Sequence, residues 1–410
     1  MTTTDTPAAP SRWHGVLRQI TTGGAAISVL SFVLALIAGA ILIAFTNQDV
    51  QAAAGYFFAR PGDTFKAIWD AVSGAYIALF QGAVYNPHAG TFAGQIKPLT
   101  ESLKFATPLI AAGLGVGLAF RSGLFNIGGQ GQIIVAAAAA GYVGAYVDLP
   151  VVIHLIVATA AGMAAGALWA GIAGFLKAKT GAHEVILTIM LNNIAIYLLA
   201  WMLATPHVLQ APGTSNPKTA AMLDTAVLPK ILGGSFNLHA GFILALVAVV
   251  FTWWLLERSS LGFRLRAVGE NPNAARVAGI NVNRSYIVVM LIAGALVGIA
   301  GVSQALGTLP GGFAGDVDGG IGFDAITVAL LGRSSPWGIL AAGVLFGAFK
   351  SGGFTMQVAE QVPNEVVLVV QSLIVLFIAA PPLVRAIFRL PDPERRRKKK
   401  PARSQKEVSA

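Results

Sequence analysis

Three long stretches of this sequence contain no charged residue. Ala25–Phe45, Val151–Leu176 and Tyr286–Gly307 carry no Asp, Glu, Lys or Arg. About 20 helical residues cross the roughly 30 Å of hydrocarbon in a bilayer, so each stretch is long enough to span one. Because lipid offers no hydrogen bonds to the backbone, a spanning stretch must pair its own backbone groups as a helix. The sequence therefore predicts an all-α, polytopic membrane protein.

The composition agrees with a lipid environment. Of the 410 residues, 55% are hydrophobic and only 11% are charged, whereas a soluble domain is about one quarter charged. The chain has no cysteine, which excludes disulfides and thiolate metal sites. We expect no metal and no cofactor bound to this chain. Six scattered His, without paired catalytic carboxylates in one motif, also argue against a membrane-embedded enzyme.

Basic residues near the ends of the apolar stretches predict the orientation, because they favour the cytoplasmic side. Arg12 and Arg18 place an N-terminal tail, residues 1–24, in the cytoplasm. Residues 25–388 then form the transmembrane domain, and residues 389–410 form a basic cytoplasmic tail that contains "RRRKKK". Anionic lipid on the inner leaflet is the expected partner of that tail, rather than nucleic acid.

About ten crossings satisfy every basic cluster, and some of them are short or broken. Residues 46–104 are expected outside and include an amphipathic helix with apolar residues at helical spacing between Phe65 and Phe80. Residues 258–284 form a long cytoplasmic segment. The expected crossings are Ala25–Phe45, Phe105–Phe120, Ile133–Val147, Val151–Leu176, Val185–Ala204, Ala240–Leu256, Tyr286–Gly307, Ile321–Leu331, Trp337–Phe349 and Val366–Ile387.

The stretch "RSGLFNIGGQGQ", residues 121–132, is unusual because it puts four Gly and three amides between two apolar runs. Each Gly costs a helix about 1 kcal/mol relative to Ala. Irregular backbone at membrane depth is tolerated where it is buried or lines a wet cavity, and short, Gly-interrupted spans often mark transport sites. A cytoplasmic turn is the alternative. The short pair Ile321–Leu331 and Trp337–Phe349 repeats the theme, since Arg121-Ser122 and Arg333-Ser334 occupy similar places.

Other polar side chains lie inside predicted spans, where they are costly and usually functional. For Asn193 the alternative is an interhelical hydrogen bond, and for Asp324 it is a helix N-terminal charge or a packing contact. A path lined mainly by neutral donors and acceptors suits a polar, largely uncharged solute. The candidate path residues are Phe125, Asn126, Gly128, Gln130, Gln132, Asn192, Asn193, Phe323 and Asp324.

The cytoplasmic segment contains a short predicted helix. Asn271 is a good N-cap, Pro272 fits the first helical position, and Gly279 is a natural terminator. Ala274, Ala275 and Ala278 would give this helix a small, flat face that suits a groove on a cytoplasmic partner. An ordinary inner loop is the alternative.

Four blocks, in order, resemble the membrane permease of an ATP-binding-cassette (ABC) importer of the simple-sugar and nucleoside branch, which is related to the ribose and branched-chain amino-acid permeases. The blocks are "GLFNIGGQGQ", "EVILTIMLNNIA", "LGFRLRAVGENPNAARVAGINV" and "GFDAITVALLGRSSPWGIL", within about Thr100 to Ile387. One departure is Gln130, where Glu is frequent in the family; the neutral side chain removes a possible charge at this position.

The resemblance implies the bacterial cytoplasmic (inner) membrane, with both termini in the cytoplasm. It also implies a second permease, identical or different, a cytoplasmic ATPase that uses ATP, and an extracellular or periplasmic solute-binding (lipo)protein. The short helix would then couple the chain to the ATPase. The coupling residues would be Gly269, Glu270, Asn271, Pro272, Ala274, Ala275, Arg276 and Gly279.

The expected function is ATP-driven uptake of nucleosides, with a simple sugar as the alternative solute. The chain lacks the G-x-x-x-x-G-K-[ST] phosphate loop, because "GAFKS" at 347–351 has no Gly before its Lys. A partner must therefore hydrolyse ATP, and this chain is a permease subunit rather than an enzyme. An ion-coupled secondary transporter is less expected and would depend on Asp324 or Glu184.

Overall fold

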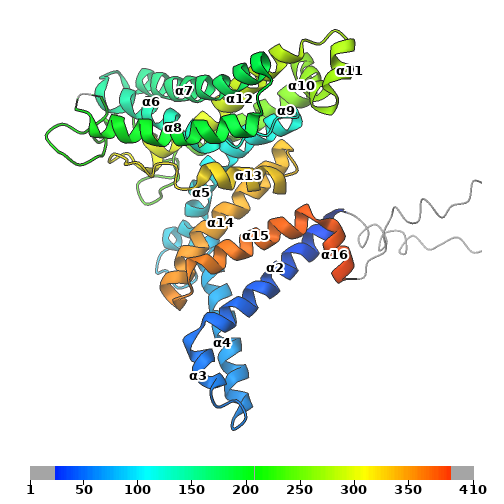
Figure 1. The fold of residues 1–410 in the computed structure, drawn as a ribbon. Coiled ribbons are helices and arrows are strands. Elements are labelled where there is room, and N and C mark those ends of the chain that lie inside the picture. Colours follow the sequence, from blue (N-terminus) through cyan, green and yellow to red (C-terminus); the bar gives the residue numbers. More distant parts are fainter. Residues whose placement is uncertain (1–23, 207, 389–410) are drawn as a thin grey trace, which may run out of the picture. The chain divides into compact units, whose positions relative to one another are not determined.

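A computed structural model describes residues 24–206 and 208–388 (Figure 1). Within these ranges the ordered elements are helices, and β pairing is limited to one isolated bridge between Lys230 and His239. The predicted all-α, polytopic class is confirmed. By its contacts the chain divides into two units, Met1–Val72 with Pro363–Ala410, and Ser73–Val362. The predicted tails 1–24 and 389–410 fall outside the described residues, apart from Gly24.

The first unit contains α2 (Gly24–Thr46) and α3 (Gln48–Ala54), which meet at a bend of 70°. Asn47 lies at this bend, and its side chain accepts a hydrogen bond from Val50 N at 3.1 Å as the N-cap of α3. α2 packs against α15 (Asn364–Ala379), which is followed by α16 (Pro381–Ile387). The predicted run Val366–Ile387 is therefore two helices, because a proline has no N–H to continue the hydrogen-bond ladder of α15.

The second unit is built around α12 (Val282–Val302), which packs against α5, α6 and α7. The α7–α12 contact is close because glycines face each other, and a Cβ on Gly166 would lie 3.0 Å from the Cα of Gly298. The other elements of this unit are α5 (Phe92–Arg121), α6 (Gly129–Tyr146), α7 (Val151–Thr180), α8 (Glu184–Ala204), α9 (Gly241–Arg258), α10 (Ser260–Glu270), α11 (Pro272–Val277), the π-helix η1 (Ser303–Thr308), α13 (Ile321–Leu331) and α14 (Pro336–Glu360). The helix α4 (Pro61–Ala83) belongs to both units, because the boundary between them falls after Val72.

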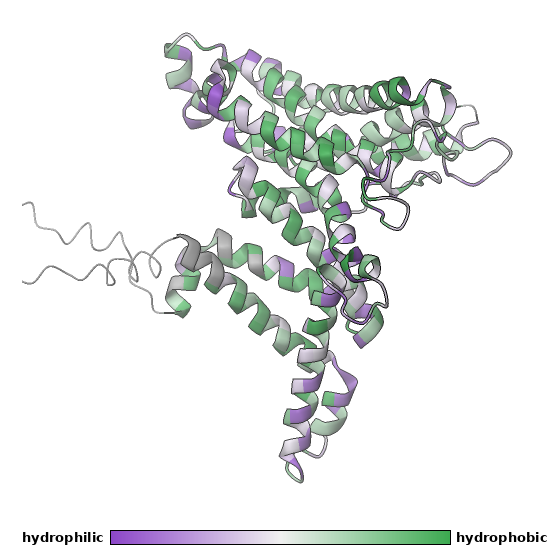
Figure 2. Ribbon diagram, turned by 180° about the vertical axis from the view of Figure 1, so that it is seen from behind, coloured by the Kyte–Doolittle hydropathy of each residue, from purple (hydrophilic) through white to green (hydrophobic). Residues whose placement is uncertain are grey.

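Among the described residues, six helices are long and apolar enough to cross a membrane, and the bent pair α2–α3 would make seven. They are α5, α7, α8, α9, α12 with η1, and α14. The predicted number of about ten is not confirmed. Figure 2 shows hydrophobic residues along these helices, while hydrophilic residues gather on α10 and α11. The predicted amphipathic helix exists as α4, and its large side chains Phe65, Trp69 and Phe80 are exposed.

Two predicted runs are parts of longer helices. α5 begins at Phe92 rather than Phe105. Trp337–Phe349 is not a short run, because it lies within α14, which has 25 residues. The helix continues through Lys350 and Ser351 because both polar groups find partners: Lys350 Nζ lies 2.7 Å from Asp324 Oδ2, and Ser351 Oγ donates to Gly82 O at 2.7 Å. Of the predicted short pair, only α13 is short.

Candidate functional site

The chain between α5 and α6 is non-helical, as the glycines predicted. Leu124, Asn126 and Gly128 are buried in this loop. Gly123 has a φ of +74°, in the left-handed region that favours glycine. The break is thus packed inside the protein, as irregular backbone in a membrane must be unless it lines a wet cavity.

Two predicted path residues, Asn126 and Gln132, bind each other. Asn126 Oδ1 accepts hydrogen bonds from Gln132 Nε2 at 2.9 Å and from Gly128 N at 3.0 Å, and Asn126 Nδ2 donates to Gln132 Oε1 at 3.3 Å. Both side chains are buried. Buried amides need such partners because an unpaired polar group is costly away from water. This pair therefore holds the shape of the loop and the first turn of α6.

Asn192 ties α8 to the same loop. Its Nδ2 donates to Ile127 O at 2.9 Å, and its Oδ1 accepts from Gly131 N at 2.9 Å. Asn193 is exposed and donates only to Ile189 O, in its own helix. The interhelical hydrogen bonds considered for Asn193 are therefore made by its neighbour Asn192.

Glu184, the first residue of α8, also contacts the loop. Its Oε1 accepts a hydrogen bond from Phe125 N at 3.4 Å, and its Oε2 lies 2.6 Å from Lys177 Nζ. The carboxylate therefore joins the end of α7, the start of α8 and the break. This arrangement gives Glu184 a positioning role for the loop.

The start of α13 lies against the start of α6. A Cβ on Gly129 would lie 2.9 Å from Gly322 O, and a Cβ on Gly322 would overlap the backbone nitrogen of Gln130. We call Gly129, Gln130 and Gly322 the glycine seam. The Asp318 carboxylate caps α13 beside the seam, accepting from Gly320 N at 3.1 Å and from Gly322 N at 3.0 Å. The start of α6, which follows the predicted break, thus meets the start of the short helix α13 through the backbone.

The polar ends of both broken units also lie together. Arg121 Nε donates to Ser334 O at 3.2 Å, which joins the Arg-Ser pair after α5 to the Arg-Ser pair after α13. Arg333 and Ser334 adopt positive φ values of 52° and 50°. The weak similarity between the two segments is therefore accompanied by direct contact.

Several predicted path residues remain accessible near the seam. Phe125 and Phe323 are 47% and 50% exposed, and Gln130 and Asp324 are half-buried. Asp324 forms an ion pair with Lys350 of α14. The sequence did not predict this pair, because Lys350 was recognised only as part of "GAFKS", a segment that does not match the phosphate-loop motif. A lone Lys within an apolar helix was the available signal.

Trp169 of α7 is a second residue that the sequence did not indicate. Its Nε1 is buried and has no hydrogen-bond partner in the described part of the chain. A Cβ on Gly131 would lie 3.0 Å from this nitrogen and from Asn192 Oδ1. A free donor therefore lies beside the amides of the break. Among the described residues, no group of three His, Cys, Asp or Glu side chains could hold a metal ion.

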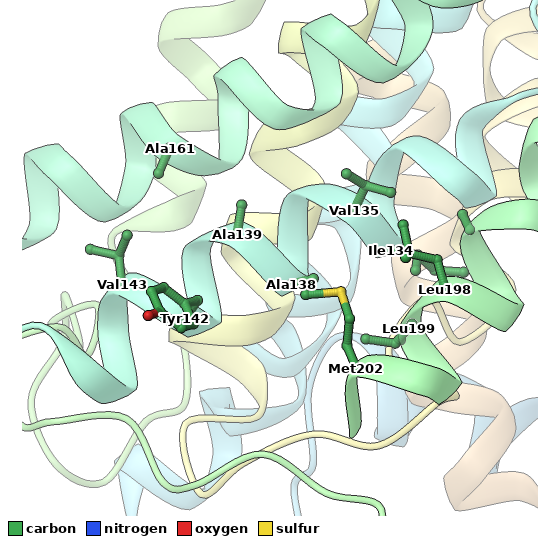
Figure 3. Close-up of a pocket in the computed structure, with 11 residues that line it drawn as sticks. Ile134, Val135, Ala138, Ala139, Tyr142, Val143, Ala161, Leu198, Leu199 and Met202 are labelled. Carbon is green, nitrogen blue, oxygen red and sulfur yellow. The ribbon is translucent and has the colours of Figure 1, made fainter. Parts of the chain in front are cut away.

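A cavity of about 430 Å³ lies elsewhere, along α6 and α8 with Ala161 of α7 (Figure 3). Apart from the Tyr142 hydroxyl its side chains are apolar, and Ile134, Leu199 and Met202 line it. This lining suits hydrocarbon better than a polar solute. The seam, rather than this cavity, is the candidate site.

The predicted cytoplasmic helix exists as α11. Asn271 Oδ1 accepts from Asn273 N and Ala274 N, both at 3.0 Å, and Gly279 has a φ of +81°. Its flat alanine face is incomplete, because Ala275 is buried in a cluster with Val268 and Val282. The helix α10 that precedes it was not predicted.

The exposed surface of α11 differs from the predicted one. Val277 is 91% exposed, and Glu270, Asn271, Ala274 and Arg276 are exposed as well. Pro272 is half-buried, and Gly269 packs against the backbone of Arg121 at the end of α5. The coupling candidates therefore adjoin the helix that leads into the break.

Comparison with known proteins identifies the class. Residues 99–379 match the family described as the permease component of branched-chain amino acid transport systems. This match covers more than half of the chain, so the protein belongs to that family of membrane permeases. No solved structure matches the chain significantly.

The individual relatives narrow the class. The guanosine ABC transporter permease NupP of Bacillus subtilis is 40% identical over 317 residues, 77% of this chain and 90% of that protein. The glucose ABC transporter permease TsgB13 of Haloferax volcanii is 38% identical over 290 residues (68% and 75%), and the nucleoside ABC transporter permease NupB of Lactococcus lactis is 34% identical over 319 residues (75% and 86%). Bacillus subtilis has a second matching guanosine permease, NupQ.

These matches define a multi-pass ABC permease of the simple-sugar and nucleoside branch. Such a subunit is not itself an enzyme, since the ATPase of an ABC transporter is a separate component. It works within a transport complex.

Proposed function

We propose that this chain forms the translocation path of an ATP-driven importer of nucleosides. The observation that carries the proposal is the 40% identity to a guanosine permease over 90% of that protein. Accessible groups near the seam and on α8 support it. Amide groups on Gln130 and Asn193 suit the hydrogen-bonding edge of a base and the hydroxyls of a ribose. Exposed rings such as Phe125 and Phe323 can stack on a base.

The path residues divide into two roles under this proposal. Asn126, Gly128, Gln132 and Asn192 maintain the break, because their polar atoms already bind the protein. Phe125, Gln130, Asn193, Phe323 and Asp324 contact the solute, because their side chains are exposed or half-buried. Lys350 and Trp169 join the second group.

The complex is proposed to include a second permease, a cytoplasmic ATPase and an extracellular or periplasmic binding (lipo)protein. Two matching guanosine permeases in Bacillus subtilis support a second permease subunit. The ATPase would bind at α11, over Gly269–Arg276 and Gly279, and its closure would move the α5 end through Gly269. ATP is bound by that partner.

The proposed location is the bacterial cytoplasmic membrane, with α10 and α11 inside. The basic residues Lys177, Lys179, Arg258 and Arg284 all lie at helix ends and support this orientation. Both termini are then cytoplasmic, where the basic tail 389–410 can bind anionic lipid.

Uptake by the reconstituted complex tests the proposal. Vesicles that contain this chain, its cognate permease, ATPase and binding protein are given labelled guanosine, uridine, glucose or ribose. We expect ATP-dependent uptake of nucleosides and none when ATP is omitted. A preference for glucose or ribose would favour the second candidate, a sugar permease, which the 38% identity to a glucose permease supports.

Uptake by this chain alone, without ATP or partner, would instead identify an ion-coupled secondary transporter. Asp324 would then be the natural coupling group. Its ion pair with Lys350 argues against that role, because the carboxylate already has a charged partner within this chain. Measuring uptake into vesicles that carry a proton or Na⁺ gradient but no ATP distinguishes the two mechanisms.

A further inference from the structure

A cavity of about 490 Å³ lies where α5 and α9 end and α14 begins. Two tryptophans, two arginines and the turn before α14 form its walls. Its lining residues are Arg121, Trp253, Glu257, Arg258, Ser335, Pro336 and Trp337. The cavity is separate from the glycine seam, and the proposed solute path does not use it.

The charges of this cavity favour an anion. Arg121 and Arg258 line it, and neither forms an ion pair within the part of the chain that the structure describes. The carboxylate of Glu257 is offset, because its Oε2 lies 3.5 Å from Arg266 Nη1. Arg121 uses Nε for Ser334 O, which leaves the terminal nitrogens of its guanidinium for a ligand. Two guanidinium groups on one cavity match the oxygens of a phosphate.

The start of α14 adds to the positive potential of the cavity. Pro336 opens the helix, and the side chain of its N-cap, Ser335, makes no capping hydrogen bond. The positive end of the helix dipole therefore faces the same cavity. Without the arginines this would be an ordinary helix start, but together these groups favour negative charge at one place.

The surroundings indicate a lipid rather than a soluble anion. Val247, Val250 and Trp254 follow one exposed, apolar face of α9 toward Arg258. In a membrane-spanning helix such a face contacts acyl chains, and Trp and Arg mark its interfacial end. Arg258 lies over the Trp253 ring at 5.8 Å, and Trp337, which also lines the cavity, is half-exposed. The cavity therefore lies at the depth of lipid head groups.

We infer that this cavity binds the phosphate head group of one anionic phospholipid, held by Arg121 and Arg258, with its acyl chains along α9. The ligand comes from the surrounding bilayer. The site joins the ends of α5 and α9 to the turn before α14, so an occupied site would brace the helix that enters the break.

The test measures lipid retained by the full-length permease. The protein is purified in detergent with equal amounts of phosphatidylglycerol and phosphatidylcholine, and bound lipid is counted by native mass spectrometry during stepwise delipidation. We expect one phosphatidylglycerol per chain to be retained longest. Arg121→Gln/Arg258→Gln should lose this lipid, with about tenfold weaker retention for each charge-assisted contact removed.

Two controls keep the result interpretable. Arg284→Gln removes an exposed arginine at the start of α12, outside the cavity, and should retain lipid as the wild type does. Arg258→Gln alone tests the site if the double variant does not fold, because Arg258 is exposed at the end of α9. It should weaken retention about tenfold.

Several outcomes would overturn the inference. One is equal retention of the two lipids by the wild type, and another is unchanged phosphatidylglycerol retention in the double variant. Inorganic phosphate that displaces the lipid completely would assign the cavity to a free anion. Loss of ATPase binding with normal lipid retention would make it a protein-docking surface. None of these results bears on nucleoside specificity.

Discussion

At the scale of single residues, the amides of the break shape the protein as much as they line a path. Asn126, Gln132 and Asn192 each bind protein atoms with nearly all their polar groups. Such a network is stabilising when complete and costly when one member is lost. Substitutions in it should therefore affect folding before they affect solute choice.

Asn192 and Asn193 provide a matched test of this difference. Asn192→Leu leaves Ile127 O and Gly131 N without a partner, so we expect the free energy of unfolding to fall by about 2 to 4 kcal/mol. Asn193→Leu removes only a bond within α8 and should cost much less. Thermal unfolding of the two purified variants measures the difference. Equal melting temperatures would contradict the proposed roles.

His239 predicts a dependence of stability on pH. It lies just before α9, outside the candidate spans, and burial, with a smaller effect of Lys104, lowers its pKa to about 4. Below pH 6.5 the unfolded chain binds a proton that the folded chain refuses, so stability is lost as the pH falls from 6.5 toward 4. At pH 5 the expected loss is about 2 kcal/mol.

The measurement compares melting temperatures of wild type and His239→Gln from pH 7.5 to 4.5. The quantity compared is the slope of melting temperature against pH, because other groups titrate in both proteins. The variant should lose less stability on acidification than the wild type. Parallel pH profiles would show that His239 is not buried in its neutral form.

At the scale of elements, the short helix α13 depends on its neighbours for position. Its start packs on α6 through the glycine seam, and Asp324 on it pairs with Lys350 of α14. An isolated helix of 11 residues is marginal, so these tertiary contacts supply most of its stability.

The Asp324–Lys350 pair separates positioning from solute contact. Asp324→Asn or Lys350→Met alone leaves one charge unpaired in a largely apolar setting and should lower the melting temperature. The double variant should recover part of that loss, because no uncompensated charge remains. Uptake should stay impaired in the double variant if Asp324 contacts the solute. If the double variant recovers both its melting temperature and its uptake, the pair only positions α13 against α14.

At the scale of the whole molecule, the break and α11, the proposed coupling helix, are connected through α5. Gly269 packs on the backbone of Arg121, where α5 ends and the loop toward α6 begins. Motion imposed on α10 and α11 therefore has a direct physical route to the seam, through backbone rather than flexible side chains.

Val277 tests how that motion is imposed. Its apolar side chain is almost fully exposed at the end of α11, as expected for a contact with a partner. Val277→Asp should abolish co-purification of the ATPase and ATP-dependent uptake without changing the melting temperature of the permease. Val277→Leu keeps the apolar contact and should behave as wild type. Normal ATPase binding by Val277→Asp would move the coupling surface elsewhere.

Local chemistry was predictable from sequence, but long-range partners were not. Asn271 and Gly279 mark the two ends of α11 as expected, because helix caps depend only on residues a few positions away. The glycines correctly predicted a break after α5. The choice of Asn192 over Asn193 depends on the rotation of α8, and the length of α14 depends on a partner for Lys350 in another helix. A prediction from hydropathy alone ends the apolar run at Phe349, because the next residue is the charged Lys350.

The glycine seam restricts how a passage could open there. Gly129 and Gly322 meet without side chains between them, so no rotamer change can make room for a molecule. Two main chains must separate as rigid bodies, which breaks many small attractions together. A barrier of this kind is either shut or open, and thermal fluctuation of one residue does not leak solute through it. An importer that works against a gradient needs this behaviour, since solute already taken up must not flow back between transport cycles.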